Sequence, residues 1–161
     1  MTWLKRLFVS DLPLLRNIEG IDSLQNLSYL RLSGNRGSLD PSLHLVSLKP
    51  IAGLAKLAKL TIANVRPDDD DITPIASVSN LRDLTISSKL EHKQLAFLAK
   101  RLNPQLVRPI TAYLELNSVY PKCRGPLYLF IGRKMPLLCK TCKNEEFERL
   151  PLQFERLVAE S

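Results

Sequence analysis

The sequence predicts an α/β fold: a short solenoid of about four strands, a capping helix and a small mixed α/β appendage. The main observation is a line of apolar residues in three-residue steps that closes on a two-residue step, and the line recurs in register. Its copies are Ile18, Ile21, Leu24, Leu27, Leu30 and Leu32; Leu48, Ile51, Leu54, Leu57, Leu60 and Ile62; and Ile72, Ile75, Val78, Leu81, Leu84 and Ile86. Leu4, Leu7 and Val9 end a further, partial copy. Strand starts are therefore expected at Leu4, Leu27, Leu57 and Leu81, spaced 23, 30 and 24 residues.

The two kinds of step in this line suit two kinds of backbone. The closing two-residue step fits a short strand with alternate side chains turned inward. The three-residue steps fit a tight 3₁₀-like return that keeps one ridge facing the interior. The alternative, helical hairpins with leucine-rich faces, is disfavoured because Pro50 and Pro74 would interrupt the helices. Stacked repeats would bury one continuous apolar column.

The segment Leu27-x-x-Leu30-x-Leu32-x-x-Asn35 resembles the leucine-rich repeat signature. The full line is similar to the short repeats of bacterial internalin-like proteins, and the resemblance covers residues 2–90. It implies a non-enzymatic module that presents a concave repeat surface to another protein. We predict that residues 1–104 form the repeats with a capping helix at Glu91–Leu102, and that residues 105–161 form the appendage.

Residues between the column positions should point outward on the strand side of the repeats. Phe8, Tyr29 and Arg31 are of the types that dominate interface energetics, and Arg6 with Lys59 favours an acidic partner. The alternative is an ordinary sheet surface. The predicted partner-binding residues are Arg6, Phe8, Tyr29, Arg31, Lys59, Thr61, Asp83 and Thr85.

The C-terminal segment has a different pattern. Alternation predicts a strand at Val107–Leu116 and a hairpin at Leu127–Leu138 around Gly132. A final helix at Phe147–Val158 is expected to be capped by Asn144 and to be interrupted or restarted at Pro151.

Three cysteines lie in this segment. Cys139-Lys-Thr-Cys142, with Cys123 before the hairpin, resembles a degenerate zinc ribbon in which Tyr120 replaces the fourth cysteine. The resemblance implies a zinc site whose fourth ligand is His92, the nearest histidine in sequence, or water. Buried free thiols and a redox pair are the alternatives. With the basic residues Lys122, Arg124, Arg133, Lys134, Lys140 and Lys143, a zinc-ribbon-like module that binds nucleic acid, with the repeats as scaffold, is the second hypothesis for the function.

Other features predict little chemistry. The run Asp68 to Asp71 lacks the spacing of a calcium loop and is interpreted as an exposed turn, with Asp71 capping the next segment. His44 belongs to an insertion at 36–47, whose Leu43, Leu45 and Val46 are expected to pack back. The chain has two histidines and no glycine-rich phosphate loop, so no enzyme and no cofactor besides zinc is expected.

The net charge of +7 is concentrated after residue 90. The sequence has no apolar run long enough to span a membrane and no signal peptide, which predicts a cytoplasmic protein without membrane contact. The first strand begins without a preceding cap. We expect Trp3 and Phe8 to cover this edge, or self-association through it, or a chain that is the remnant of a longer protein.

Overall fold

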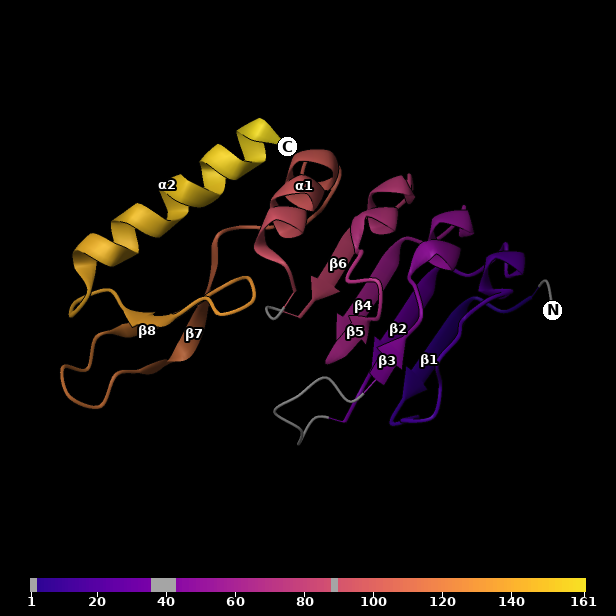
Figure 1. Cartoon of the computed structure of the whole chain (residues 1–161), viewed down its shortest axis with the longest axis horizontal. Helices are drawn as coiled ribbons and strands as arrows, with labels where there is room; N and C mark the ends of the chain where they lie inside the picture. Colours follow the sequence, from indigo (N-terminus) through magenta and orange to yellow (C-terminus); the bar gives the residue numbers. More distant parts are fainter. Residues whose placement is uncertain (1–2, 36–42, 88–89) are drawn as a thin grey trace. The chain divides into compact units, whose positions relative to one another are not determined.

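The computed structural model describes residues 3–35, 43–87 and 90–161 (Figure 1). Its contacts define two compact units, which are considered separately below. The first comprises Met1–Ser87 and Arg101–Pro109, and the second comprises Ser88–Lys100 and Ile110–Ser161. The functional division at residue 104 stays a prediction.

The first unit is built on a parallel sheet in the order β1-β2-β4-β6. These strands are β1 (Arg6–Ser10), β2 (Tyr29–Ser33), β4 (Lys59–Ala63) and β6 (Asp83–Ile86). Each begins two residues after the leucine at which the repeat pattern predicts a strand. The chain returns through short 3₁₀ helices, η1 (Ile21–Ser23), η2 (Lys49–Gly53) and η3 (Thr73–Ser77). Pro50 and Pro74 lie in the first turn of η2 and η3, where a missing N–H costs least, so the helical-hairpin alternative is wrong.

The predicted apolar column is the core of this unit. Every position of the three full copies is buried except Leu24 and Ile86, which are half-buried, and most are fully shielded from solvent. Each fully buried leucine or isoleucine contributes about 1.5–3 kcal/mol relative to an exposed one. In the partial first copy Leu4, Leu7 and Val9 are only half-buried, and Trp3 is 74% exposed, so Trp3 does not cover this edge.

A repeated hydrogen-bond pattern holds the strands in register. The carbonyl of Lys5 accepts from the N–H groups of Ser28 and Tyr29. One repeat further, the Ser28 carbonyl accepts from the N–H groups of Ala58 and Lys59. The Ala58 carbonyl accepts from Arg82 and from Asp83, the first residue of β6. Since every strand entrance is fixed in the same way, equivalent residues of successive repeats lie side by side.

The insertion after β2 contributes a second, smaller sheet. Here β3 (Leu43–Leu45) pairs in parallel with β5 (Val65–Pro67), a strand that the repeat pattern did not predict. Leu43 and Leu45 are buried as expected, whereas Val46 is 52% exposed and the expectation for it was wrong, because it follows the last paired residue. The turn expected between Gly37 and Ser42 lies outside the described residues.

The aspartate turn is held by ion pairs with cations of this chain. Arg16 contacts Asp68 at 2.6 Å, His44 lies 3.6 Å from the same carboxylate, and Arg66 pairs with Asp70 at 3.0 Å. The carboxylate of Asp71 accepts the N–H of Thr73, the first residue of η3. The interpretation as a turn is therefore confirmed, whereas the N-cap residue of η3 is Ile72, with Asp71 one residue before it.

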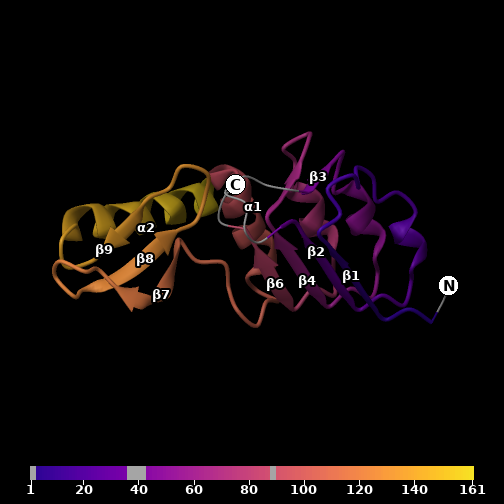
Figure 2. The same cartoon turned by 90° about the horizontal axis from the view of Figure 1, so that it is seen from below.

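The second unit packs a helix on an antiparallel sheet. It contains β7 (Tyr113–Val119), β8 (Pro126–Phe130) and β9 (Leu137–Cys139), with α2 (Asn144–Glu160) lying along the sheet (Figure 2). Phe130, Leu138, Phe147 and Leu150 form its buried cluster. Most of α1 (His92–Leu102) belongs to this unit as well. The β8–β9 hairpin confirms the one predicted around Gly132.

Three local predictions need correction. The strand expected at Val107–Leu116 begins only at Tyr113, since residues 101–109 pack with the first unit, where the Val107 N–H donates to the Arg82 carbonyl. Asn144 is not the N-cap but the first helical residue. The final helix also runs through Pro151 without a break. Proline removes one intrahelical donor, and burial of Phe147 and Phe154 on one face of α2 offsets that loss.

Among the described residues, no helix combines the length and apolar character needed to cross a membrane.

Candidate partner-binding site

The parallel register arranges the outward side chains in rows across β1, β2, β4 and β6. The first row is Arg6, Tyr29, Lys59 and Asp83, and the second is Phe8, Arg31, Thr61 and Thr85. The structure thus brings all the predicted partner-binding residues onto one face of the sheet. Their role in binding stays a prediction.

Aromatic rings and a lysine form the first part of the site. The rings of Phe8 and Tyr29 meet edge to face with centroids 4.9 Å apart. On the other side of Tyr29, the Lys59 ammonium lies 5.2 Å from the ring centroid. Contacts of these two kinds each contribute about 0.5–1.5 kcal/mol. Tyr29 is therefore held between two neighbours, while Phe8 keeps 56% of its surface exposed.

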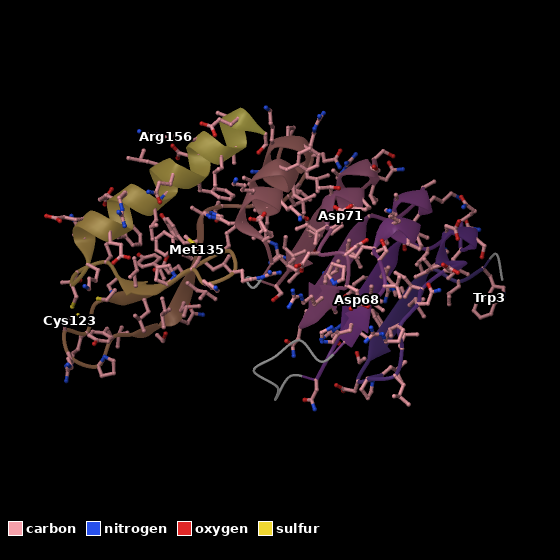
Figure 3. All side chains as sticks on the ribbon, viewed as in Figure 1. Trp3, Asp68, Asp71, Cys123, Met135 and Arg156 are labelled. Carbon is pink, nitrogen blue, oxygen red and sulfur yellow. The ribbon has the colours of Figure 1, made fainter. Side chains whose placement is uncertain are left out.

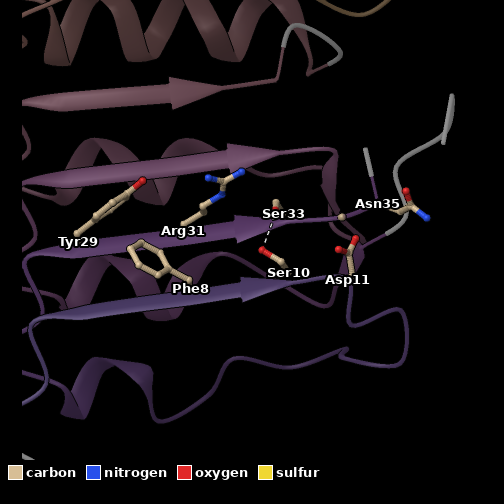
Figure 4. A pocket seen from close by; sticks show the side chains of 8 residues that line it. Phe8, Ser10, Asp11, Tyr29, Arg31, Ser33 and Asn35 are labelled. Atoms are coloured by element: carbon tan, nitrogen blue, oxygen red, sulfur yellow. Dashed lines mark hydrogen bonds between the residues drawn. The ribbon is translucent and has the colours of Figure 1, made fainter. Parts of the chain in front are cut away.

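A hollow of about 570 Å³ lies beside these rings, over the C-terminal ends of β1 and β2 (Figure 4). The hydroxyl groups of Ser10 and Ser33 are hydrogen-bonded across it at 2.8 Å. Asp11, Gly34 and Asn35 also line it. None of the three was predicted as a binding residue, and Asn35 was noted only for its place in the repeat signature. The sequence feature that could have indicated them is their position, because each follows closely on the last residue of a predicted strand.

Arg31 is the distinctive group of this hollow. In the part of the chain that the structure describes, its Nε is buried and has no hydrogen-bond partner, and no acidic group pairs with it. A buried donor left unsatisfied costs about 1–3 kcal/mol, and more on a charged group. The planar guanidinium matches a carboxylate through two parallel hydrogen bonds. The hollow therefore places the Arg31 guanidinium beside the two aromatic rings and in the same hollow as the Asp11 carboxylate.

Lys59 differs from Arg31 because its positive charge is already paired with a carboxylate. Asp83 accepts from Arg108 at 2.7 Å and lies 2.9 Å from the Lys59 ammonium. Hydrogen bonds from Arg108 and then from Lys59 hold the pKa of Asp83 below its usual value. Lys59 therefore already has an acidic neighbour on this face, and its expected preference for an acidic partner stays a prediction.

The three cysteines converge in the second unit. Cys123 lies in the turn between β7 and β8 (Figure 3), Cys139 ends β9, and Cys142 precedes α2. Their sulfur atoms all lie within 4.8 Å of one another. Cys139 is buried, whereas Cys123 and Cys142 are exposed, so buried free thiols are the wrong description for those two.

The thiols have unequal environments. Burial by itself raises the pKa of Cys139. Hydrogen bonds from the N–H groups of Cys142 and Thr141 and from the Cys123 thiol have the larger, opposite effect, and together they lower this pKa to about 7. The interaction with Cys123, with burial, raises the pKa of Cys142 to about 12.

His92 does not join this cluster. Its ring stacks on Phe154 with centroids 5.3 Å apart and planes 9° from parallel, and its Nε2 is buried without a hydrogen-bond partner among the described residues. Burial lowers its pKa. The expectation that His92 supplies a fourth metal ligand was therefore wrong, since α1 holds it against α2 instead.

Parallel strands joined by 3₁₀ returns over a leucine-rich column make the first unit leucine-rich-repeat-like. Comparison with known proteins finds no family model and no curated protein that matches the chain. Among solved structures, the chain is similar to an internalin (inlF) from Listeria monocytogenes str. 4b F2365. The two share 26% identity with a TM-score of 0.46, over 60% of this chain and 26% of that chain. This chain thus matches about a quarter of that internalin's length.

Proposed function

We propose that the first unit is a short leucine-rich-repeat solenoid that binds a partner protein through its outward strand face and catalyses no reaction. The observation that carries the proposal is the Arg31 guanidinium, buried at Nε and unpaired among the described residues, beside two aromatic rings. A stable fold usually satisfies such a donor. A partner that brings a carboxylate to the Arg31 guanidinium would give this charge the ion-pair partner that it lacks among the described residues.

The neighbours of Arg31 suit an interface centre. Phe8 and Tyr29 offer apolar area at low entropic cost, because Tyr29 is already fixed between Phe8 and Lys59. Aromatic and arginine side chains in a hollow are the usual hot spots of interfaces. The proposed partner is therefore a protein with an acidic side chain flanked by apolar groups. The proposed setting is the cytoplasm, where free cysteines remain reduced.

The proposal is tested by capturing partners from a lysate with the whole chain, identifying the captured protein, and measuring its affinity by calorimetry. Arg31→Ala is expected to weaken binding about 30-fold, equivalent to about 2 kcal/mol. Arg31→Lys should recover only part of this loss, because ammonium lacks the fork geometry. Lys49→Ala is the matched control, since Lys49 is exposed on η2, in a return segment. Equal affinities for Arg31→Ala and Lys49→Ala, with both variants folded, would rule out this face.

Repeating the affinity measurement at raised salt distinguishes a protein partner from nucleic acid. Binding to phosphates weakens steeply with added salt, because each neutralised phosphate releases counterions. An interface with an aromatic centre weakens much less. A steep salt dependence that persists in Arg31→Ala would favour the basic C-terminal segment and nucleic acid instead.

A further inference from the structure

We propose that Cys123, Cys139 and Cys142 bind one zinc ion and leave its fourth coordination position open. Cys142 Sγ donates to Cys123 Sγ at 3.0 Å, and the Cys123 and Cys139 sulfur atoms lie 3.3 Å apart. Zinc–sulfur bonds of about 2.3 Å in a tetrahedron place the sulfur atoms about 3.8 Å apart. All separations here are at most 4.8 Å, so shifts of about 1 Å or less would bring the three thiolates to one ion.

The backbone around Cys123 is folded to present its sulfur. The Tyr120 N–H donates to the Gly125 carbonyl, and the Arg124 N–H donates to the Tyr120 carbonyl, which closes a tight turn. Arg124 takes the left-handed conformation with φ of 55°. The Gly125 N–H points to Cys123 Sγ at 3.4 Å. The turn therefore holds the Cys123 sulfur close to the sulfur atoms of Cys139 and Cys142.

A second turn presents the other two sulfur atoms. The Lys143 N–H donates to the Cys139 carbonyl at 3.0 Å and closes the loop that contains both cysteines. The two turns meet at Gly125, where a Cβ atom would lie 2.7 Å from Cys139 Sγ and would also collide with the Thr141 hydroxyl. Only glycine leaves the three sulfur atoms room to converge.

The charges and the donor set favour zinc. Three thiolates and a divalent zinc ion sum to one negative charge, and the exposed flanking residues Lys122, Arg124 and Lys143 are positively charged at neutral pH. Thiolates select zinc over magnesium and calcium. Among the described residues, no histidine or acidic side chain completes the cluster. Structural zinc sites usually have four protein ligands, so the fourth position here is left to water or another small donor.

The test uses the full, reduced chain with zinc and, as a spectroscopic probe, cobalt(II). We expect one zinc per chain, protection of all three thiols from a thiol reagent, and release of that protection by a chelator. Cobalt should give thiolate charge-transfer bands and tetrahedral ligand-field bands. Added imidazole should shift the ligand-field bands, because it can enter an open position; bands that do not respond would overturn the open position.

Variants identify the ligands. Cys139→Ser should weaken zinc binding about 100-fold or more, since even outer-shell changes cost 10–100-fold. Gly125→Ala retains every thiol but should also weaken binding, because its new methyl group would lie 2.7 Å from Cys139 Sγ and would displace that sulfur. Ser118→Ala, on exposed β7, is the control and should bind normally. Circular dichroism at each step shows that the second unit is folded. Failure of the reduced, folded wild type to bind zinc, or undiminished binding by Cys139→Ser, would overturn the proposal.

Discussion

Replacing Leu60 by aspartate tests whether the repeat line forms one apolar column. Leu60 is fully buried in β4, so the change forfeits about 1.5–3 kcal/mol of apolar burial. It also buries a carboxylate without a partner, which costs several kcal/mol more. The sum is comparable to the whole stability of a domain, about 5–15 kcal/mol. We therefore expect the first unit to unfold.

Thr61→Asp is the matched control, one residue along the same strand. Thr61 points outward, and its register neighbours are Arg31 and Thr85. A carboxylate opposite Arg31 should be neutral or stabilise by up to about 1 kcal/mol. It should also block binding of an acidic partner, because it occupies the Arg31 guanidinium.

Thermal unfolding followed by circular dichroism distinguishes these variants. For a unit of this size, 1 kcal/mol shifts the melting temperature by about 4–8 °C. Leu60→Asp should lose the transition of the first unit while Thr61→Asp keeps it within a few degrees. Equal melting temperatures for the two variants would refute the inward and outward assignment.

Two further changes probe the first unit. The pKa of Asp83 is lowered by Arg108 and a lysine, so its ion pairs stabilise the fold above the usual pKa of about 4 and are lost as the pH falls through the folded-state pKa. Asp83→Asn should therefore lower the free energy of unfolding by about 1 kcal/mol at neutral pH and weaken its decrease toward acid pH. Unfolding free energy measured against pH checks this, and an unchanged decrease toward acid pH would contradict it. Gly53→Ala would place a methyl group 2.7 Å from Asp22 Cβ in the neighbouring return. We expect it to lower the free energy of unfolding, measured by chemical denaturation, by about 1–3 kcal/mol. The control Ala52→Ser, at an exposed position, should lower it by less than about 0.5 kcal/mol.

The core was predictable from sequence because burial in this fold follows a fixed period. Ile51 lies in η2 and Leu54 directly follows it; their three-residue spacing predicted their burial, and both are buried. The prediction failed where spacing is not the deciding factor. Pro151 is tolerated inside α2 because tertiary packing of that helix outweighs one missing hydrogen bond.

The candidate sites were predictable only in part. Alternation placed Arg31 on the outward face, but it carried no sign that Nε would be buried without a partner, since that depends on side chains from adjacent strands. The spacing of Cys139 and Cys142 indicated a pair of sulfur ligands, and Cys123 does join them. The separation of His92 from this cluster depends on how α1 packs, which sequence distance does not encode.

The outward side chains of the strand face lie at regular spacings, because the parallel strands are in register. Neighbouring strands lie about 4.8 Å apart, and successive outward positions along one strand lie about 6.6 Å apart. Inward neighbours such as Leu60 and Ile62 are fully buried on the other side of the same strand that carries Thr61. Each outward position can therefore be exchanged without repacking the interior, so the binding proposed for this face can be tested one residue at a time.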